Sequence, residues 1–427
     1  MDSSQKFSAL RNISDTKHCY IENKERMWAY TASFYVVRKE QPMLIINAKI
    51  ITMDSADIEK GYIKISGGKI EAVGEMSEKP SAVQNEDIID LAGKIAMPGF
   101  IDAHSHIGLQ EDGLGDEGDD INEMTDSFTP HLRALDGINP FDKCFAEAKA
   151  AGITCVAVSP GSANSVGGQI CVMKTEGRWI DEMLVSEFAA VKFALGENPK
   201  TVYSDKSQSP STRMASAAAI RENLYKAQRY MQDKEKAVQE ETDLPEYDAR
   251  MEALVPLLKG EVKAHIHAHR AYDIMTGIRI AKEFSLDFVL VHCTEGYLVA
   301  DILGEMQATA ICGPVISARM KPELSGATLK NSAELEAAGV KVAICTDHPV
   351  IPQDFLPLSM QIAHANGLSS SGALAAITIN AAIAAGVDDR VGSISPGKDA
   401  DIQVYSKDPL TTFAKPEMVF INGKCVV

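Results

Sequence analysis

The feature that most constrains the fold of this chain is a long alternation of short apolar segments with helical segments, from residue 98 to residue 387. The apolar segments read GFIDAH, GITCVAVS, AAVKFAL, VKAHIHAH, DFVLVHC, TAICGPV and VKVAICTD, with helical stretches such as AYDIMTGIRIAKEF and NSAELEAAG between them. Such alternation is typical of a parallel sheet covered by helices. Its length, about 290 residues, fits an eight-fold parallel barrel, which usually takes ~250 residues. We therefore predict an α/β fold with a (β/α)8 TIM-like barrel over residues 98–387.

Both flanks of this region read as β structure. Residues 43–97 contain LIINAKIITM, GYIKISGGKIEAVG and DIIDLAGKIAM, and residues 388–427 contain ADIQVYS and MVFINGKCVV. The Gly-Gly pair at 67–68 and the Asn-Gly pair at 422–423 are typical of tight turns between strands. We expect the two flanks to form one small β-sandwich domain.

Two further segments stand outside this plan. Residues 1–42 show no sustained period, so we predict an N-terminal extension that is not part of the core, with the folded chain beginning near Met43. Residues 212–243 are polar and helical and interrupt the strand–helix alternation. We expect this second segment to lie outside the barrel, with its charges on a solvated face.

Charge and cysteine usage exclude several classes of protein. The chain has 42 basic and 59 acidic side chains and a net charge of −17, whereas nucleic-acid binding needs a basic surface. No apolar run approaches the ~20 residues of a membrane-spanning helix, and the N-terminus lacks the pattern of an export signal. The eight cysteines form no CxxC pair, which indicates free thiols in a reducing compartment. We expect a cytoplasmic protein whose partner is a small molecule, not nucleic acid or a membrane.

Polar side chains recur at the ends of the predicted strands, where barrels place their active sites. One strand–helix unit takes ~30 residues in a barrel of ordinary size. The 25 positions from His267 to His292 and the 55 from His292 to Asp347 therefore match one and two units. The full set falls on strands one, four, five, six and eight: His104, His106, Lys192, His267, His292 and Asp347.

These residue types favour a metal site. Imidazole nitrogens and a carboxylate are usual ligands of zinc and related divalent ions, and catalytic sites leave one position open for water. A metal ion lowers the pKa of that water to ~7. A lone histidine at a strand end is more often structural, but four histidines and an aspartate at regular intervals indicate a ring of ligands. His104 and His106 are one residue apart, so both point to the same face of their strand.

Several segments resemble the amidohydrolase superfamily of metal-dependent hydrolases. PGFIDAHSH is similar to its HxH strand, and GSISPGKDADIQV resembles the stretch that closes its β-sandwich domain. KAHIHAHRAYDI, VHCTEGY, ALGENPK and CTDHPVIP resemble most the imidazolonepropionase-related and metallo-dipeptidase-like branch. The resemblance covers residues 43–427 and implies the same barrel and sandwich.

The resemblance also implies roles for the strand-end residues. His104, His106 and Asp347 would hold the more buried metal ion, zinc in the first place, with iron as an alternative. His267 and His292 would bind a second ion, or one would bind while the other polarises the substrate carbonyl. Asp347 would also be the general base, taking the proton of water and passing it to the leaving nitrogen.

Lys192 decides how many ions the site holds. In two-metal members of the superfamily a lysine on the fourth strand is carboxylated and bridges the ions, and Lys192 in AVKFALG is the matching residue. The alternative is an ordinary lysine at the barrel rim that pairs with an acid such as Glu197. At this point both readings, and a site for one or two ions, stay open.

Other histidines surround the predicted ligands. His265, His267 and His269 alternate along strand five and face one way if the strand continues. We assign His267 as the ligand because HAHRAYDI resembles the family's stretch. His269 would then lie at the mouth in contact with substrate, and His265 would pack deeper in the barrel. His348 either supports the site or is a loop residue.

Two loops are expected to shape the substrate pocket. Residues 159–169, SPGSANSVGGQ, follow strand two, and their backbone amides would meet a polar ligand unless the segment is an ordinary connection. Residues 196–214 carry Arg213, and Arg270 follows strand five. The forked donors of either arginine suit a substrate carboxylate, although a surface ion pair explains each arginine equally well.

The predicted activity is metal-dependent hydrolysis of a C–N bond, in an amide, a cyclic amide or a small peptide. Deamination of a heterocycle is the alternative, but deaminases of this superfamily carry a glutamate where this chain has Arg270. A non-catalytic scaffold is a third reading, disfavoured by the complete set of ligand types. Relatives in the superfamily further suggest a homo-oligomer.

Overall fold

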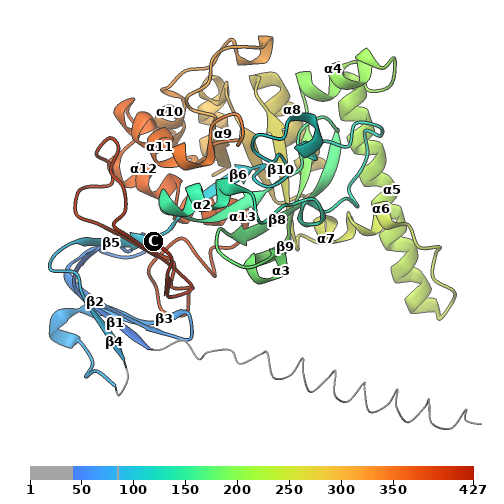
Figure 1. Cartoon of the computed structure of the whole chain (residues 1–427). Coiled ribbons are helices and arrows are strands. Elements are labelled where there is room, and N and C mark those ends of the chain that lie inside the picture. The colour runs from blue at the N-terminus through green and yellow to red at the C-terminus, as the bar shows by residue number, and fades with distance from the viewer. Residues whose placement is uncertain (1–41, 84–85) are drawn as a thin grey trace, which may run out of the picture. The chain divides into compact units, whose positions relative to one another are not determined.

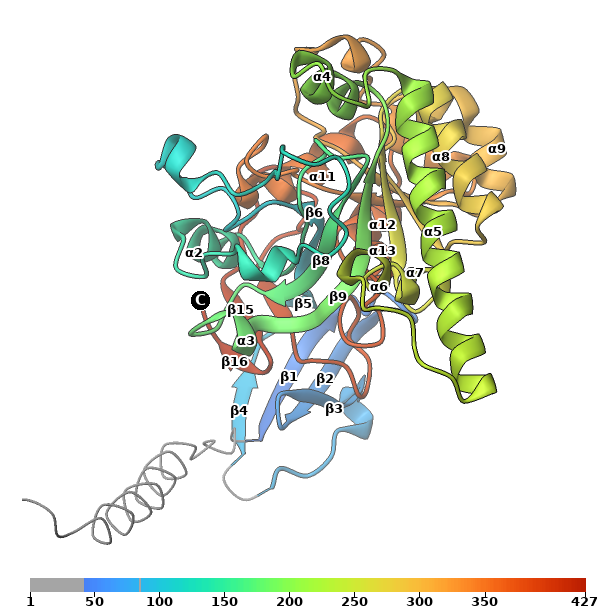
Figure 2. The ribbon, with the colours of Figure 1, turned by 90° about the vertical axis from the view of Figure 1, so that its right-hand side faces the viewer.

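Two β-sheets organise residues 42–83 and 86–427, the part of the chain that the computed structural model describes (Figure 1). The predicted extension, residues 1–42, lies outside the described residues except for Pro42. The larger sheet has eight strands and curves into a barrel (Figure 2). In spatial order its strands are β6 (Phe100–Ser105), β7 (Ile153–Val158), β8 (Val166–Lys174), β9 (Leu184–Ala194), β10 (Lys263–Ala268), β11 (Phe288–His292), β12 (Thr309–Cys312) and β13 (Lys341–Ile344).

The barrel is closed near its carboxyl end by backbone hydrogen bonds between β6 and the segment after β13. The amide of Asp347 donates to the carbonyl oxygen of His104 (3.2 Å), and the amide of His106 donates to that of His348 (3.0 Å). The predicted α/β barrel is confirmed, and its first and last strands bring two sets of candidate ligands together.

The barrel strands are apolar on both faces because one face meets the interior and the other meets helices. Every residue of β6 and β7 is buried, a pattern typical of parallel strands covered by helices. The seven apolar segments of the sequence correspond to β6, β7, β9, β10, β11, β12 and β13.

The third barrel strand differs from the predicted parallel arrangement. β8 pairs antiparallel with both β7 and β9, and it includes residues 166–169, for which the sequence predicts a loop. The glycines there read as a turn, but in the structure they permit a close approach of backbones. A Cβ on Gly168 would lie 2.4 Å from the carbonyl oxygen of Leu132. Because β8 is reversed, its last residue, Lys174, pairs with Cys155 near the amino end of β7.

The smaller sheet combines strands from both flanks, as predicted. The turn between β2 and β3 uses Gly67 and Gly68, and the turn between β15 and β16 uses Asn422 and Gly423, all with positive φ, which two-residue hairpins require. The division of the chain into domains at residues 97/98 and 387/388 stays a prediction. The strands in spatial order are β16 (Lys424–Cys425), β15 (Met418–Ile421), β14 (Ile402–Tyr405), β5 (Ile95–Pro98), β1 (Met43–Ile50), β2 (Ile58–Ser66) and β3 (Lys69–Glu75), with β4 (Asp87–Asp90) also paired to β1.

Helices surround the barrel (Figures 1 and 2). The longest, α5, corresponds to the polar helical segment expected outside the barrel. The hydroxyl of Thr212 caps it by accepting a hydrogen bond from the Ala215 amide (3.1 Å). The helices are α2 (Lys143–Ala150), α3 (Ile180–Met183), α4 (Glu197–Asp205), α5 (Arg213–Glu240), α6 (Ala249–Glu252), α7 (Val255–Leu258), α8 (Ala271–Glu283), α9 (Ala300–Glu305), α10 (Asn331–Ala337), α11 (Leu356–Ala365), α12 (Ser370–Ala376) and α13 (Ile379–Ala385).

Two expectations from composition concern the whole described chain. Among residues 42–83 and 86–427, no helix combines the length and apolar character needed to span a membrane. The cysteines in this part are free thiols, and all but Cys425 are buried.

Candidate metal centre

The six predicted strand-end residues come together at the carboxyl ends of the parallel barrel strands. Counted from β6, they lie on strands one, four, five, six and eight, as the spacing predicted. Strand pairing fixes their relative heights: Lys192 on β9 is opposite His265 on β10, and Ala268 on β10 is opposite His292 on β11. The fold therefore converts widely separated sequence positions into one buried cluster.

Two groups within this cluster have the arrangement of metal ligands. The first, here called the aspartate group, contains His104, His106 and Asp347, and its ligand atoms lie within 4.8 Å of one another. The Asp347 Oδ1 atom is 3.4 Å from His104 Nε2 and 3.3 Å from His106 Nε2. The Nδ1 atom of His106 contacts the carbonyl oxygen of Ser159 at 2.6 Å. A ring that donates from Nδ1 leaves its Nε2 lone pair for a metal ion.

The second, here called the histidine group, contains His267, His269 and His292, again with ligand atoms within 4.8 Å. The ring centroids are 4.5 Å apart for His267 and His292 and 4.6 Å apart for His269 and His292. His292 Nδ1 contacts the carbonyl oxygen of Gly313 at 2.8 Å, and His269 Nδ1 contacts the hydroxyl of Thr294 at 2.7 Å. In each of these two rings the Nε2 atom therefore remains available to a ligand at the centre of the histidine group.

His269 differs from its predicted place at the mouth of the barrel, because it is buried with 3% of its surface exposed. The segment after β12 explains the difference. Its 3-10 helix η5 (Pro322–Leu324) brings the Glu323 carboxylate to 3.6 Å from His269 Nε2. Glu323 is itself 1% exposed, and no local sequence pattern predicts its position because it lies far from every histidine along the chain.

The donor atoms of both groups fit a divalent cation. Among the described residues, neither ring nitrogen of His267 has a hydrogen-bond partner. A buried polar atom left unpaired costs about 1–3 kcal/mol, so such atoms call for a ligand. Burial lowers the pKa of His267 and His269 well below the usual value and that of His292 to about 4. The rings are therefore neutral, the form that binds metals.

Asp347 combines burial with a position at the centre of the aspartate group. Burial raises the pKa of Asp347, but the neighbouring rings of His292, His104 and His106 lower it and hold it well below the usual value. Its side chain is 16% exposed, so one part of the carboxylate reaches the open side of the site.

Lys192 lies between the strands that carry the two groups and is fully buried. Its Nζ atom is 2.9 Å from His104 Nε2, and burial lowers its pKa to about 8. The acid partner considered from sequence, Glu197, lies elsewhere: its carboxylate accepts a hydrogen bond from the Glu323 amide at 3.1 Å. A Cβ on Gly167 would lie 3.3 Å from Lys192 Cβ, so the glycine gives this lysine room.

A buried hydrogen-bond network that the sequence did not predict lies behind the aspartate group. The Asp102 carboxylate accepts hydrogen bonds from the Thr346 hydroxyl (2.5 Å), the Gln353 side chain (2.6 Å) and the His104 amide (3.1 Å). It therefore ties β6 to the segment that carries Asp347. The one signal in the sequence was an acidic residue two positions before His104 inside an apolar strand.

The remaining predicted histidines have packing roles. His348 is buried, and its Nδ1 accepts a hydrogen bond from the Gln353 amide (3.1 Å), so it supports the loop after β13. His265 lies deeper in the barrel, as expected, with Nε2 at 3.0 Å from the carbonyl oxygen of Ala384.

Both arginines considered for substrate binding are paired with carboxylates. Arg213 Nε donates to both oxygens of Asp273 (3.0 and 3.1 Å), and Arg270 Nη1 donates to Glu295 (2.5 Å). The ion-pair reading of these residues therefore matches the structure, and substrate binding by either stays a prediction.

Comparison with known proteins identifies the family of this chain. Residues 95–426 match the model of the amidohydrolase family. The chain belongs to this family. The predicted resemblance to the amidohydrolases is thereby confirmed.

Relatives of this amidohydrolase include proteins of named activity. It is 28% identical over 391 residues to the amidohydrolase tasK of Hapsidospora irregularis, covering 85% of this chain but only 39% of that protein. It is 26% identical over 385 residues to an imidazolonepropionase of Caldanaerobacter subterraneus subsp. tengcongensis, covering 81% of this chain and 84% of that enzyme. Among solved structures, an amidohydrolase from Thermotoga maritima MSB8 is 42% identical, with a TM-score of 0.86, and covers 90% of this chain and 99% of that one.

Proposed function

We propose that this amidohydrolase hydrolyses the C–N bond of an amide or cyclic amide in a small molecule or small peptide. The observation that supports the proposal most directly is the pair of buried ligand groups at the carboxyl ends of one barrel. Their donors are imidazole nitrogens and a carboxylate, which suit zinc and also iron. We infer zinc as the first candidate.

In this proposal the aspartate group holds one ion, and His267 and His292 hold a second. A bound ion supplies a water of pKa ~7 and polarises the carbonyl of the substrate. His269 is placed for either role, as a third ligand of the histidine group or as a contact to substrate through its Nε2 atom. Its Nδ1 contact with Thr294 fixes the ring in either case.

Asp347 acts as the general base. Its carboxylate accepts a proton from the attacking water, the water oxygen forms a bond to the carbonyl carbon, and the C–N bond breaks. Asp347 then passes the proton to the leaving nitrogen, so the products are a carboxylate and an amine, joined in one molecule when the substrate is cyclic. His292 helps to orient the carbonyl, and its Nδ1 contact with Gly313 keeps Nε2 directed into the site.

We propose that Lys192 Nζ adds carbon dioxide and loses a proton to become a carbamate, whose oxygens would help to hold the metal ions. The support is its full burial without a carboxylate ion pair among the described residues, and its contact with His104. Arginine cannot be carboxylated but keeps the charge, so Lys192→Arg should lower the bound metal from two ions to one or none. Elemental analysis measures this ratio, and an unchanged ratio would leave Lys192 an ordinary buried lysine.

A substrate screen tests the proposed activity. Purified protein is supplied with zinc and assayed against N-acyl amino acids, dipeptides and small lactams, while ammonia release from aminated heterocycles is followed in parallel. We expect amine or ring-opened product from the first set and no ammonia from the second. Ammonia release with no amide cleavage would make the protein a deaminase and overturn the proposal.

Two further proposals concern the cellular location and the assembly of the protein. The buried free thiols favour a reducing compartment, the cytoplasm. Relatives in the superfamily favour a homo-oligomer, which size-exclusion chromatography with light scattering measures.

A further inference from the structure

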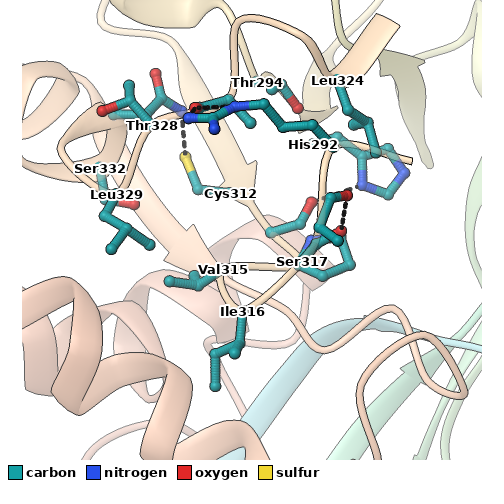
Figure 3. Close-up of a pocket in the computed structure, with 16 residues that line it drawn as sticks. His292, Thr294, Cys312, Val315, Ile316, Ser317, Leu324, Thr328, Leu329 and Ser332 are labelled. Atoms are coloured by element: carbon teal, nitrogen blue, oxygen red, sulfur yellow. Dashed lines mark hydrogen bonds between the residues drawn. The ribbon is translucent and has the colours of Figure 1, made fainter. Parts of the chain in front are cut away.

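A cavity of about 510 Å³ opens beside the histidine group, and it is not explained by metal binding. Its size lies in the range of small-molecule sites, ~300–1,000 Å³. The segment after β12 forms most of its wall, and His292 lies at its edge (Figure 3). Gly313 lines the cavity, and its carbonyl oxygen contacts His292 Nδ1 at 2.8 Å. A ligand in this cavity therefore lies next to a side chain that we assign to the reaction.

One wall of the cavity is apolar. Figure 3 shows Val315, Ile316 and Leu329 along the side away from His292, and Leu324 also lines the cavity. An aliphatic group placed against these side chains would leave water, which favours binding by about 25 cal/mol per Å² of buried apolar surface. The wall thus suits an aliphatic group of the substrate.

The same cavity is lined by a cation without a carboxylate partner. Arg319 Nε and Nη2 donate to the carbonyl oxygen of Ala327 (3.2 and 2.6 Å). Within the part of the chain that the structure describes, no carboxylate makes an ion pair with Arg319. The contact with Ala327 holds the guanidinium at the cavity, and among the described residues the Nη1 group of Arg319 makes no hydrogen bond or ion pair.

Other cations near the site have such partners. Arg213 pairs with Asp273 and Arg270 with Glu295, and Lys321 Nζ lies 2.9 Å from Glu323. A substrate carboxylate would have to displace these acids, whereas at Arg319 it would meet an available donor. Charge-assisted hydrogen bonds of this kind are the strong ones.

We infer that Arg319 binds a carboxylate of the substrate and that the apolar wall holds the aliphatic side chain beside it. This inference rests on the proposed amide hydrolysis and names its substrate class: an N-acyl derivative or dipeptide of an aliphatic α-amino acid. The amide lies at the metal centre, and the amino-acid half extends along the segment after β12.

The test compares two amides that differ only in the carboxylate, N-acetyl-leucine and N-isopentylacetamide. Charge-assisted hydrogen bonds contribute roughly 1.5–3 kcal/mol, equivalent to about tenfold or more in affinity. We expect Arg319→Met to raise KM for N-acetyl-leucine by at least about tenfold with little change in kcat, and to leave N-isopentylacetamide unaffected. Arg319→Lys should fall between wild type and Arg319→Met, because it keeps the charge but not the fork.

The matched control is Arg229→Met, since Arg229 is an exposed arginine on α5 that pairs with Asp233. It should behave as wild type with both amides. Wild-type protein should also prefer N-acetyl-leucine to N-acetylglycine by about tenfold or more, because the apolar wall buries the leucine side chain.

The outcomes separate this inference from the proposed function. If wild-type protein cleaves no amide or lactam at all, the proposed function fails. If it cleaves amides but Arg319→Met affects both leucine-type substrates equally, Arg319 only stabilises its loop and the inference is wrong. It is also wrong if wild type cleaves lactams or other amides and ignores N-acetyl-leucine.

Discussion

Two buried polar clusters occupy opposite ends of the same barrel, and they differ in how their polar atoms are paired. The metal centre lies at the carboxyl ends of the parallel strands, and it contains ring nitrogens without a partner. At the other end Lys174, the last residue of the reversed strand β8, is almost fully buried against the smaller sheet. Its Nζ atom lies 2.6 Å from Asp401 and 3.1 Å from Asp399.

The cluster around Lys174, here called the ionic cluster, has its charges paired. Asp399 also contacts Arg390 (2.8 Å) and Lys69 (2.7 Å). The second oxygen of Asp401 accepts a hydrogen bond from the Asn422 amide (3.0 Å). Charged groups at this depth are tolerated when they are paired and hydrogen-bonded.

The difference teaches how to separate structural from functional burial in one molecule. In the ionic cluster each charged group is paired with another side chain, so we infer a structural role, which is to hold β8 against the C-terminal part of the smaller sheet. The candidate metal centre holds neutral histidines, and among the described residues His267 has no hydrogen-bond partner at either ring nitrogen, which supports the proposed role of this cluster in metal binding and catalysis. Substitutions in the ionic cluster should therefore lower the free energy of unfolding, and substitutions in the candidate metal centre should lower the activity.

The largest expected effect is the loss of activity at the metal centre. Asp347→Asn removes the proposed general base, which is also a proposed metal ligand, so kcat should fall by at least about 10³-fold. Dialysis against a chelator should have a similar effect on wild type and be reversed by zinc. Circular dichroism should show an intact fold in both cases, and an active Asp347→Asn protein would remove the role assigned to this residue.

A smaller effect, on stability, is expected at the ionic cluster. Lys174→Met leaves two buried carboxylates without their central cation, which should lower the free energy of unfolding by about 3–5 kcal/mol. Urea unfolding measures this change. The kcat of the folded fraction should stay at the wild-type value, since Lys174 lies at the far end of the barrel.

Lys424→Met is the matched control for this prediction. Lys424 also pairs with a carboxylate, that of Glu176 at 3.1 Å, but its side chain is 64% exposed. Exposed ion pairs contribute about 0–1 kcal/mol. Equal effects of the two substitutions would contradict the structural role of burial at Lys174.

The smallest expected effect is a pH dependence that belongs to the ionic cluster. Burial would raise the pKa of Asp399, but the charge of Lys174 and hydrogen bonds from Arg390 and Lys69 lower it from 3.8 to about 2. A carboxyl group whose pKa is lowered in the folded state stabilises the protein at pH values above the pKa that the group has in the unfolded chain. That stability, about 2 kcal/mol, is lost as the pH falls from about 4 to about 2.

The measurement is the difference in unfolding free energy between wild type and Asp399→Asn as a function of pH. This difference should be constant above about pH 5 and shrink below about pH 4, because only wild type carries the titrating group. A difference that stays constant down to the pH of unfolding would show that Asp399 has an ordinary pKa.

Much of the barrel and its candidate ligands could be predicted from sequence because both leave local patterns. Apolar runs of strand length mark β6, β7 and β9 to β13, and His104 and His106 share a face through the two-residue period of a strand. The reversed strand β8 left no such pattern, since its glycines resemble a turn until Leu132 is packed beside them.

Pairing of charged side chains could not be predicted. The sequence alone does not distinguish three arginines that have different surroundings in the structure. Arg213 and Arg270 are paired with acids, whereas Arg319 lines a cavity. Asp102 and Gln353 are far apart along the chain and are joined only by the closure of the barrel.

The sequence by itself determined the fold class, the family and the strand ends that carry His104, His106, Lys192, His267, His292 and Asp347, because periodicity and spacing are properties of nearby residues. Only the tertiary structure decided that His269 joins the histidine group and that a cavity forms beside His292. It also decided that Lys174 forms an ion pair with Asp401 at the opposite end of the barrel. The physical reason is that hydrogen bonding, burial and charge pairing depend on neighbours in space, and the barrel brings those neighbours from distant parts of the chain.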